Sequence, residues 1–183
     1  MAMQPGLLIR DSRDGDLPSI MAIYAHAVSK AAGTFEIDPP DQAEMAKRRE
    51  KILAQGLPYL VAEREGKIVG YSYAGFYHQR IGYRFTLEDT VYVDEACRGR
   101  GIGRELLKSL IARCDPLGYR LMVAIIGDSK NTASIAIHEK CGFALVGTLH
   151  NCGWKFDRWL DIVLMERPLG AGAATPPVEI IKK

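Results

Sequence analysis

The chain has 183 residues, of which 48% are hydrophobic and 25% are charged, and its formal net charge at pH 7 is +2. This length fits one domain of about 100–200 residues, and these proportions argue against a disordered chain. The small net charge, with both signs interspersed, excludes the strongly basic surface that nucleic-acid binding requires, so we expect no nucleic-acid partner.

The chain also lacks sequence features of membrane, secreted and metal-binding proteins. Its longest apolar run, residues 121–126, is far shorter than the roughly 20 residues of a membrane span, and its first ten residues do not resemble a signal peptide. The four cysteines form no CxxC pair and lie near no histidine cluster, so we expect free thiols and no metal. These features together predict a cytoplasmic protein without a membrane partner.

The hydrophobic pattern alternates between helix and strand periodicity. Asp16 is expected to cap a helix with Pro18 in its first turn and an apolar stripe from Ile20 to Ala27. The predicted elements, in chain order, are a strand at 7–10, that helix, a loop at 34–40, a helix at about 41–55, a hairpin of 59–63 and 68–76, a strand at 90–93, a helix after residue 103, a buried strand at 121–126, a helix at about 132–141, and strands at 143–149 and 154–165.

Hairpins mixed with crossover helices predict a mixed sheet in an α/β or α+β arrangement. Residues 1–169 are expected to form one domain. Residues 170–183 lose all periodicity and are expected to form a flexible tail.

The most informative segment follows the strand at 90–93. Gly99, Gly101 and Gly103 open a helix there, interleaved with arginines. Glycines let an anion reach the backbone, and the first N–H groups of the helix point toward it, so this loop predicts a phosphate-bearing ligand. The spacing matches neither a P-loop nor a dinucleotide-binding fingerprint.

The pattern from Arg98 to Gly103 instead resembles the acetyl-CoA pyrophosphate loop of the GCN5-related N-acetyltransferase (GNAT) family. A second segment, NTASIAIHEKCGF at 131–143, resembles that family's other motif. The resemblance covers residues 7–166. It implies a GNAT-like acyl-CoA N-acyltransferase fold, with a mostly antiparallel sheet, a central parallel pair and flanking helices.

Within the family the chain looks most like the phosphinothricin and methionine sulfoximine acetyltransferase branch. Residues 86–93, 137–143 and 153–161 carry this similarity, and the last, GWKFDRWLD, is the most specific. The branch is usually dimeric, so the resemblance implies a homodimer.

The resemblance also implies which residues hold acetyl-CoA. The strand before the glycine loop would pair with the pantetheine arm, the loop would hold the pyrophosphate, and Asn131 would bond the pantetheine or cap the following helix. The implied cofactor-binding residues are Val91, Tyr92, Val93, Arg98, Gly99, Arg100, Gly101, Ile102, Gly103, Arg104, Asn131 and Ser134.

Two residues are candidates for catalysis. Glu88 matches the branch's presumed catalytic glutamate, acting through water, while strand alternation places its neighbour Asp89 on the opposite face. His138 stands where many relatives have a tyrosine acid, so it is either a general acid or a solvated helical histidine. A backbone N–H near Val91 is expected to polarise the carbonyl.

The acceptor site is predicted less sharply. Phe76, Arg80, Tyr83 and Arg84 lead into Glu88, and an arginine there would clamp a carboxylate while the rings shape a pocket. Lys155, Phe156 and Arg158 are further candidates for the border of this pocket, in this subunit or a neighbouring one.

The leading hypothesis is an N-acetyltransferase acting on the α-amine of a small amino acid or analogue, such as phosphinothricin, methionine sulfoximine or methionine sulfone, by direct attack in a ternary complex. One alternative is another amine as acceptor: a protein N-terminus, a polyamine or an aminoglycoside. The other is a non-catalytic acyl-CoA-binding module.

Overall fold

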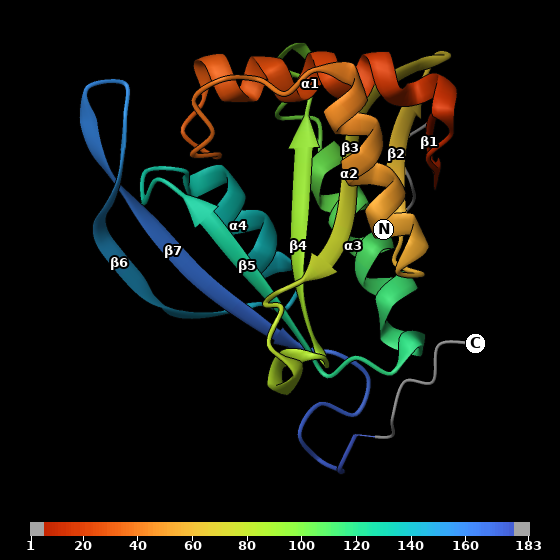
Figure 1. Ribbon diagram of the computed structural model, residues 1–183, viewed down its shortest axis with the longest axis vertical. Coiled ribbons are helices and arrows are strands. Elements are labelled where there is room, and N and C mark those ends of the chain that lie inside the picture. The colour runs from red at the N-terminus through yellow and green to blue at the C-terminus, as the bar shows by residue number, and fades with distance from the viewer. Residues whose placement is uncertain (1–5, 178–183) are drawn as a thin grey trace.

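The computed structural model describes residues 6–177, which form a seven-stranded sheet in the order β1-β2-β3-β4-β5-β7-β6 (Figure 1). All neighbouring strands are antiparallel except β4 and β5, which run parallel, so the predicted mixed sheet with a central parallel pair is confirmed. The strands are β1 (Leu7–Asp11), β2 (Tyr59–Arg64), β3 (Lys67–Phe76), β4 (Thr86–Val93), β5 (Leu121–Gly127), β6 (Ala144–Lys155) and β7 (Arg158–Pro168); the helices are α1 (Leu17–Lys30), α2 (Gln42–Ala54), α3 (Ile102–Cys114) and α4 (Thr132–Lys140).

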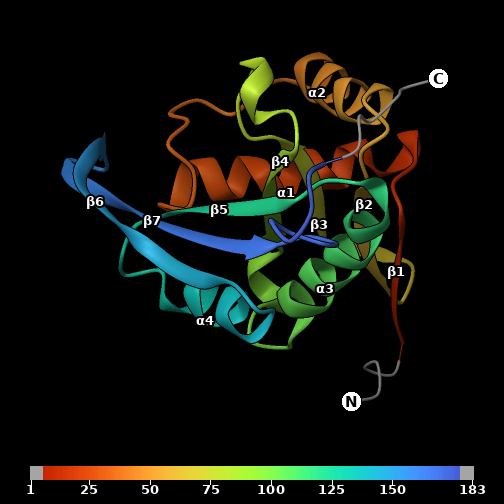
Figure 2. The same ribbon diagram turned by 90° about the horizontal axis from the view of Figure 1, so that it is seen from below.

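The helices cover both faces of the sheet. Helices α1 and α2 lie on one face, and α3 and α4 lie on the other (Figure 2). The predicted stripe on α1 is buried, and it packs against tyrosine rings of β2 and β3. On the other face, α3 buries Leu106, Leu107 and Leu110 completely. Each such leucine stabilises the fold by about 1.5–3 kcal/mol relative to an exposed one.

Asp16 does not cap α1, so that prediction is wrong. A short 3₁₀ turn over Asp14–Asp16 gives Asp16 helical backbone angles, and its side chain makes no capping hydrogen bond. The Asp16 carboxylate instead accepts hydrogen bonds from the Arg10 guanidinium, at 2.7 and 2.8 Å, and from the Arg13 N–H, at 2.7 Å. Helix α2, by contrast, is capped by Asp41, which accepts from the Glu44 N–H at 2.8 Å.

Strands β4 and β5 separate soon after they begin. Their register pairs end at Glu88 and Val123, and the two strands then diverge (Figure 1). Beyond that point β5 continues to pair with β7, and β4 with β3. Among the described residues, the stretch 89–93 of β4 therefore has no strand partner on the β5 side, which leaves backbone groups available for a ligand.

Strand β6 is longer than the predicted 143–149, and the bounds predicted for the last strand, 154–165, are wrong: residues 154–155 belong to β6, and β7 begins at Arg158. The two strands form a hairpin that extends beyond the sheet (Figure 1). Phe156 and Asp157 make its turn with φ of 54° each, the angles of a type I′ turn.

The start of the predicted tail contacts the rest of the chain. The Gly170 N–H donates to the Asp115 carboxylate at 3.2 Å, and the Arg120 guanidinium donates to the Thr175 hydroxyl at 3.3 Å and to the Pro176 carbonyl at 3.0 Å. The predicted flexibility of 170–183 stays a prediction, and residues 178–183 lie outside the described part.

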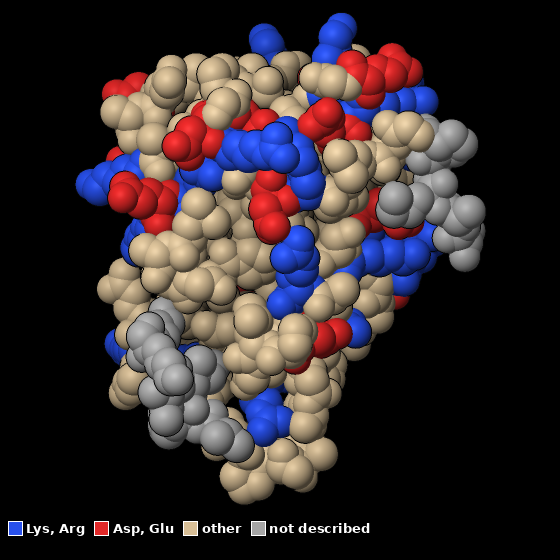
Figure 3. Space-filling view, turned by 90° about the vertical axis from the view of Figure 1, so that its right-hand side faces the viewer, with Lys and Arg blue, Asp and Glu red and all other residues tan. Residues whose placement is uncertain are grey.

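The surface and the cysteines agree with the expectations from composition. On the face turned toward the viewer in Figure 3, acidic and basic side chains are interspersed. Among the ion pairs of the described residues, Arg10 pairs with both Asp16 and Glu63. All four cysteines are free thiols, as predicted. Within residues 6–177, no helix has the length and apolar character needed to cross a bilayer, and no cluster of side chains is suited to hold a metal ion.

Candidate active site

A cleft of about 750 Å³ opens where β4 and β5 separate. Its walls are the free edge of β4, the end of β5, the glycine loop before α3, the start of α4 and the loop that follows α1. Because β4 offers unpaired backbone groups and the glycine loop offers an anion site, the cleft fits a long ligand with an anionic part.

The glycine loop has the predicted geometry. Gly99 and Gly101 have φ of 74° and 73°, in the left-handed region that favours glycine, and Gly101 directly precedes α3. The first N–H groups of α3 therefore lack partners within the helix and face the cleft with the positive end of its dipole. The side chains of Arg98 and Arg104 line the same place and add positive charge.

The structure brings together the residues predicted to bind the cofactor, except Arg100, which does not line the cleft. Asn131 accepts a hydrogen bond from the Ser134 N–H at 3.3 Å, so its interpretation as the cap of α4 is confirmed. The contacts of all these predicted cofactor-binding residues with acetyl-CoA stay predictions. The residues that line the cleft as expected are Val91, Tyr92, Val93, Arg98, Gly99, Gly101, Ile102, Gly103, Arg104, Asn131 and Ser134.

Glu88 lies at the point where the strands diverge. It is half-buried and lines the cleft. Burial, followed by the negative charge of Asp89, raises the pKa of Glu88 to about 7. A carboxylate with this pKa exchanges protons near neutral pH, as a general base does.

His138 is 3% exposed, so the alternative that it is a solvated helical residue is wrong. Its Nδ1 lies 2.7 Å from the Ser134 carbonyl oxygen, and its Nε2 lies 3.1 Å from Asp89 Oδ2. Because a carbonyl only accepts, Nδ1 carries a proton, and the contact with Asp89 requires a second proton between Nε2 and the carboxylate. Burial lowers the pKa of His138, but Asp89 outweighs it and the net shift is upward.

Asp89 is buried beside His138, on the opposite face of β4 from Glu88, as alternation predicted. A general-acid role for His138 would require the ring to give up one of its two hydrogen bonds. That role stays a prediction.

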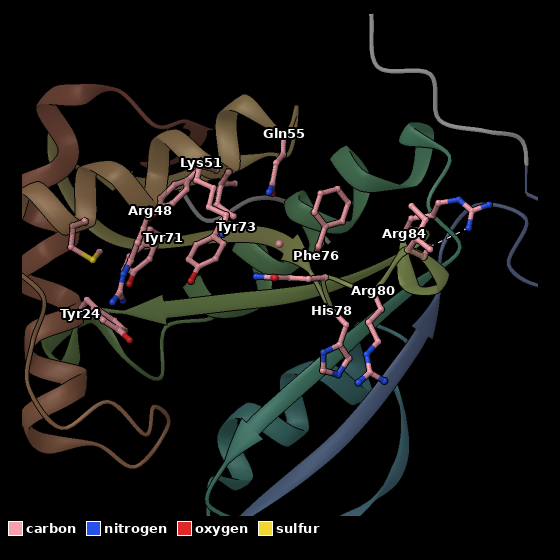
Figure 4. Close-up of a pocket in the computed structure, with 16 residues that line it drawn as sticks. Tyr24, Arg48, Lys51, Gln55, Tyr71, Tyr73, Phe76, His78, Arg80 and Arg84 are labelled. Carbon is pink, nitrogen blue, oxygen red and sulfur yellow. Dashed lines mark hydrogen bonds between the residues drawn. The ribbon is translucent and has the colours of Figure 1, made fainter.

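A second cavity of about 640 Å³ lies between α2, β3 and the segment after β3 (Figure 4). Phe76, Arg80 and Arg84 line it, as predicted for the acceptor site. Tyr83 does not: it is 42% exposed, and its ring packs on Tyr77 and His78.

The two cavities adjoin at β3. Tyr73 lines both of them, and Gly75, the cross-strand partner of Glu88, lines the second. Glu88 therefore lies between the cleft and the second cavity.

Sequence reasoning missed several residues of the second cavity. Arg48 and Lys51 reach it from α2, and tyrosine rings form its floor and walls (Figure 4). None of its described lining residues is acidic. The charged pattern of α2 was visible in the sequence, but nothing in that pattern indicates which charged residues face the sheet. The missed tyrosines are Tyr24, Tyr59, Tyr71 and Tyr73.

Lys155, Phe156 and Arg158 line neither of the two cavities in this chain, which corrects the expectation that they border the acceptor pocket of their own subunit. Lys155 donates instead to two backbone carbonyls of the loop after α1, and Arg158 pairs with Asp128.

Comparisons with known proteins agree with this geometry. The family model "Acetyltransferase (GNAT) family" matches residues 21–143. A phosphinothricin N-acetyltransferase from Alcaligenes faecalis is 54% identical over 92% of this chain and 86% of its own length. An L-methionine sulfoximine/L-methionine sulfone acetyltransferase from Pseudomonas paraeruginosa is 38% identical over 92% of this chain and 98% of its own.

A crystal structure of a phosphinothricin acetyltransferase from Sinorhizobium meliloti, in complex with acetyl-CoA, superposes with a TM-score of 0.92. It is 44% identical and covers 95% of this chain, which covers 94% of it. The matching family model and these relatives show that the chain belongs to the GNAT family and is an acetyl-CoA-dependent N-acetyltransferase.

Proposed function

We propose that the chain acetylates the α-amine of a small amino acid or analogue, such as phosphinothricin, methionine sulfoximine or methionine sulfone, by direct attack in a ternary complex. The names of its relatives support this acceptor class. The observation that carries the proposal is the position of Glu88 between a cleft suited to acetyl-CoA and a cavity lined by cationic and aromatic side chains.

The backbone N–H groups between Arg98 and Arg104 would hold the diphosphate, and the free edge of Val91–Val93 would pair with the pantetheine arm. Bound acetyl-CoA supplies the acetyl group as a thioester. We assign to the N–H near Val91 the polarisation of the thioester carbonyl.

Glu88 is the proposed general base. An α-ammonium group has a pKa near 8 at a chain terminus and a higher one in a free amino acid. A positioned base with a pKa of about 7 is partly ionised at neutral pH and assists removal of this proton, directly or through water. His138 is the proposed proton donor to the departing thiolate. To donate this proton, Nε2 must first break its contact with Asp89. We therefore expect His138→Gln to lower kcat by about tenfold at most, which is less than the loss expected from removing the Glu88 carboxylate.

The charge of the second cavity supports an acceptor that carries an anionic group. Lys51, Arg80 and Arg84 line this cavity, and none of its described lining residues is acidic. Arg48 lines it too, but its guanidinium is already paired with the carboxylates of Glu36 and Glu44. A polyamine or an aminoglycoside would meet repulsion there, whereas a carboxylate or phosphinate would be attracted.

We also propose that the enzyme is a cytoplasmic homodimer. The hairpin of β6 and β7 exposes a run of large apolar side chains, which a second copy of the chain would cover. The exposed residues are Leu145, Val146, Leu149, Trp154, Phe156 and Trp159.

The test compares wild type with Glu88→Gln, using acetyl-CoA, a panel of amines and detection of the released thiol. We expect wild type to prefer, among the amines, amino acids whose side chain carries an anionic group or a tetrahedral group such as a phosphinate, sulfoximine or sulfone. We expect kcat/KM of the variant to fall by about 10²–10⁴-fold, because it lacks the base. Acetyl-CoA affinity, measured by calorimetry, should not change.

Glu139→Gln, on the exposed surface of α4, is the matched control and should behave as wild type. Binding of acetyl-CoA without turnover of any amine would favour the non-catalytic module. Preference for a protein N-terminus or a polycation would favour the alternative acceptors, and full activity of Glu88→Gln would exclude Glu88 as the base.

A further inference from the structure

The segment 153–161, at the turn of the β6–β7 hairpin, lines neither cavity, yet its side chains hold two loops that line the cleft. Asp161 accepts from the Ser129 hydroxyl at 2.6 Å, and Arg158 pairs with Asp128, both in the loop between β5 and α4. Lys155 reaches the other loop, which follows α1 and spans residues 31–36.

Lys155 is 4% exposed, which is unusual for a lysine. Its Nζ donates to the Thr34 carbonyl at 2.8 Å and to the Ala31 carbonyl at 3.3 Å, and it lies 4.9 Å from the ring centre of Phe156. Ala31 directly follows α1, so the ammonium group lies at the negative end of the helix dipole. The two carbonyl groups of the loop thus compensate the buried charge of Lys155, and the same hydrogen bonds connect the loop to the hairpin.

Two glycines make room for the same loop. A Cβ atom at Gly153 would lie 2.2 Å from the ring of Phe35, and one at Gly127 would lie 2.4 Å from the Ala32 carbonyl oxygen. These distances are far below van der Waals contact, so the loop occupies the space that side chains at these positions would need. Loop 31–36 is therefore both bonded to the hairpin and closely packed against it.

Loop 31–36 lies between the two cavities. Residues 31–34 line the cleft together with Glu88. The Thr34 hydroxyl lies 3.2 Å from the Tyr24 hydroxyl, and the Glu36 carboxylate lies 2.6 Å from the Arg48 guanidinium. Because Tyr24 and Arg48 line the second cavity, a shift of the loop would change the contacts that hold two side chains of the proposed acceptor site.

We propose that Lys155, with Gly153, is a positioning residue that holds loop 31–36 in place and thereby determines how tightly the acceptor binds. The effect on the acceptor rests on the proposed function, whereas the hold on the loop does not. Lys155 touches neither reactant, and it acts through the backbone of Ala31 and Thr34.

The experiment compares wild type with Lys155→Met in the full chain, with Lys67→Met at the exposed start of β3 as the matched control. Hydrogen exchange of the 31–36 amides, followed by mass spectrometry without ligand, should become about tenfold faster in Lys155→Met. The acceptor KM should rise by about fivefold or more with kcat within about twofold, because the loop places the acceptor and not the base. Acetyl-CoA affinity should stay within about twofold, since the glycine loop that would hold the diphosphate is unchanged.

Gly153→Ala provides a second route to the same loop, because its methyl group displaces Phe35 while Lys155 remains. It should show the same faster exchange of loop 31–36 and the same rise in acceptor KM. If Lys155→Met does not fold, Gly153→Ala alone tests whether the hairpin holds the loop. Unchanged loop exchange in the folded variant would overturn the proposal, as would faster exchange without a rise in acceptor KM. If wild type acetylates no amino acid, the proposed function fails separately, and loop exchange alone decides the role of Lys155.

Discussion

The two cavities that meet at Glu88 are built in different ways. The cleft between β4 and β5 is made largely of backbone: a free strand edge, a glycine loop and the start of a helix. The second cavity is made of side chains contributed by α1, α2, β3 and the segment after β3. A backbone site needs glycines at fixed spacing and is visible in a sequence, whereas a side-chain site assembled from distant segments has no such pattern.

The largest expected effect lies in the backbone site. Gly101 has φ of 73°, so Gly101→Val would force a β-branched residue into the left-handed region and displace the loop. With about 1–3 kcal/mol of strain, we expect acetyl-CoA affinity by calorimetry to fall between about fivefold and 150-fold. Gly66→Val is the control, since Gly66 also has φ of 73° but lies in the β2–β3 turn. It should lower stability and leave the affinity intact; equal losses in both variants would contradict a site built on this loop.

Substitutions in the second cavity should change the KM for the acceptor and not the affinity for acetyl-CoA. Arg80→Gln removes a cation that lines the second cavity, so the KM for an anionic amino acid should rise by about tenfold, the loss of one charge-assisted hydrogen bond. Acetyl-CoA affinity should not change. Arg84→Gln is the comparison: the Arg84 guanidinium donates to the Ile81 carbonyl at 3.2 Å and stacks on Phe85, so we expect a smaller rise. The reverse order of effects would assign the clamp to Arg84.

The buried pair on the cleft side offers a spectroscopic test. In Asp89→Asn, burial of His138 remains but the carboxylate that raises its pKa is gone. The pKa of His138, measured by NMR titration of its ring protons, should therefore fall from above its ordinary value of about 6.5 to below it. An unchanged titration would show that His138 does not share its proton with Asp89.

The last expected effect is on stability and not on binding or turnover. Glu88 has a pKa of about 7 in the folded protein against 4.5 when exposed, so the folded state keeps a proton that the unfolded state loses between these values. The free energy of unfolding of wild type should fall as pH rises through this window, and Glu88→Gln should lack that fall. The difference between the two proteins in urea denaturation should therefore grow from pH 4.5 to 7 and be constant above; a difference that does not vary with pH would place the pKa of Glu88 near its ordinary value.

Much of the fold was predictable because its signals are local. The hairpin of β2 and β3, the glycine loop and the apolar strand β5 all carry patterns within a few residues of one another. The wrong predictions concern partners. Asp16 stands at a capping position, but Arg10, from the strand before it, binds its carboxylate.

His138 and Lys155 show the same limit. Each stands at a position that an isolated helix or hairpin would expose, and each is buried by a segment distant in the chain: Asp89 for the histidine and loop 31–36 for the lysine. Hydrophobic periodicity describes one element at a time, so it cannot show which charged groups another element brings to it.

From the sequence alone one obtains the order of the elements, the glycine loop that opens a helix, and the opposite faces of Glu88 and Asp89, because these depend on local spacing and strand alternation. Only the folded chain decides where β4 and β5 separate, which side chains line the second cavity, and that Asp89 joins His138. These features arise when residues far apart in the chain come within a few ångströms, where burial and charge act on them together.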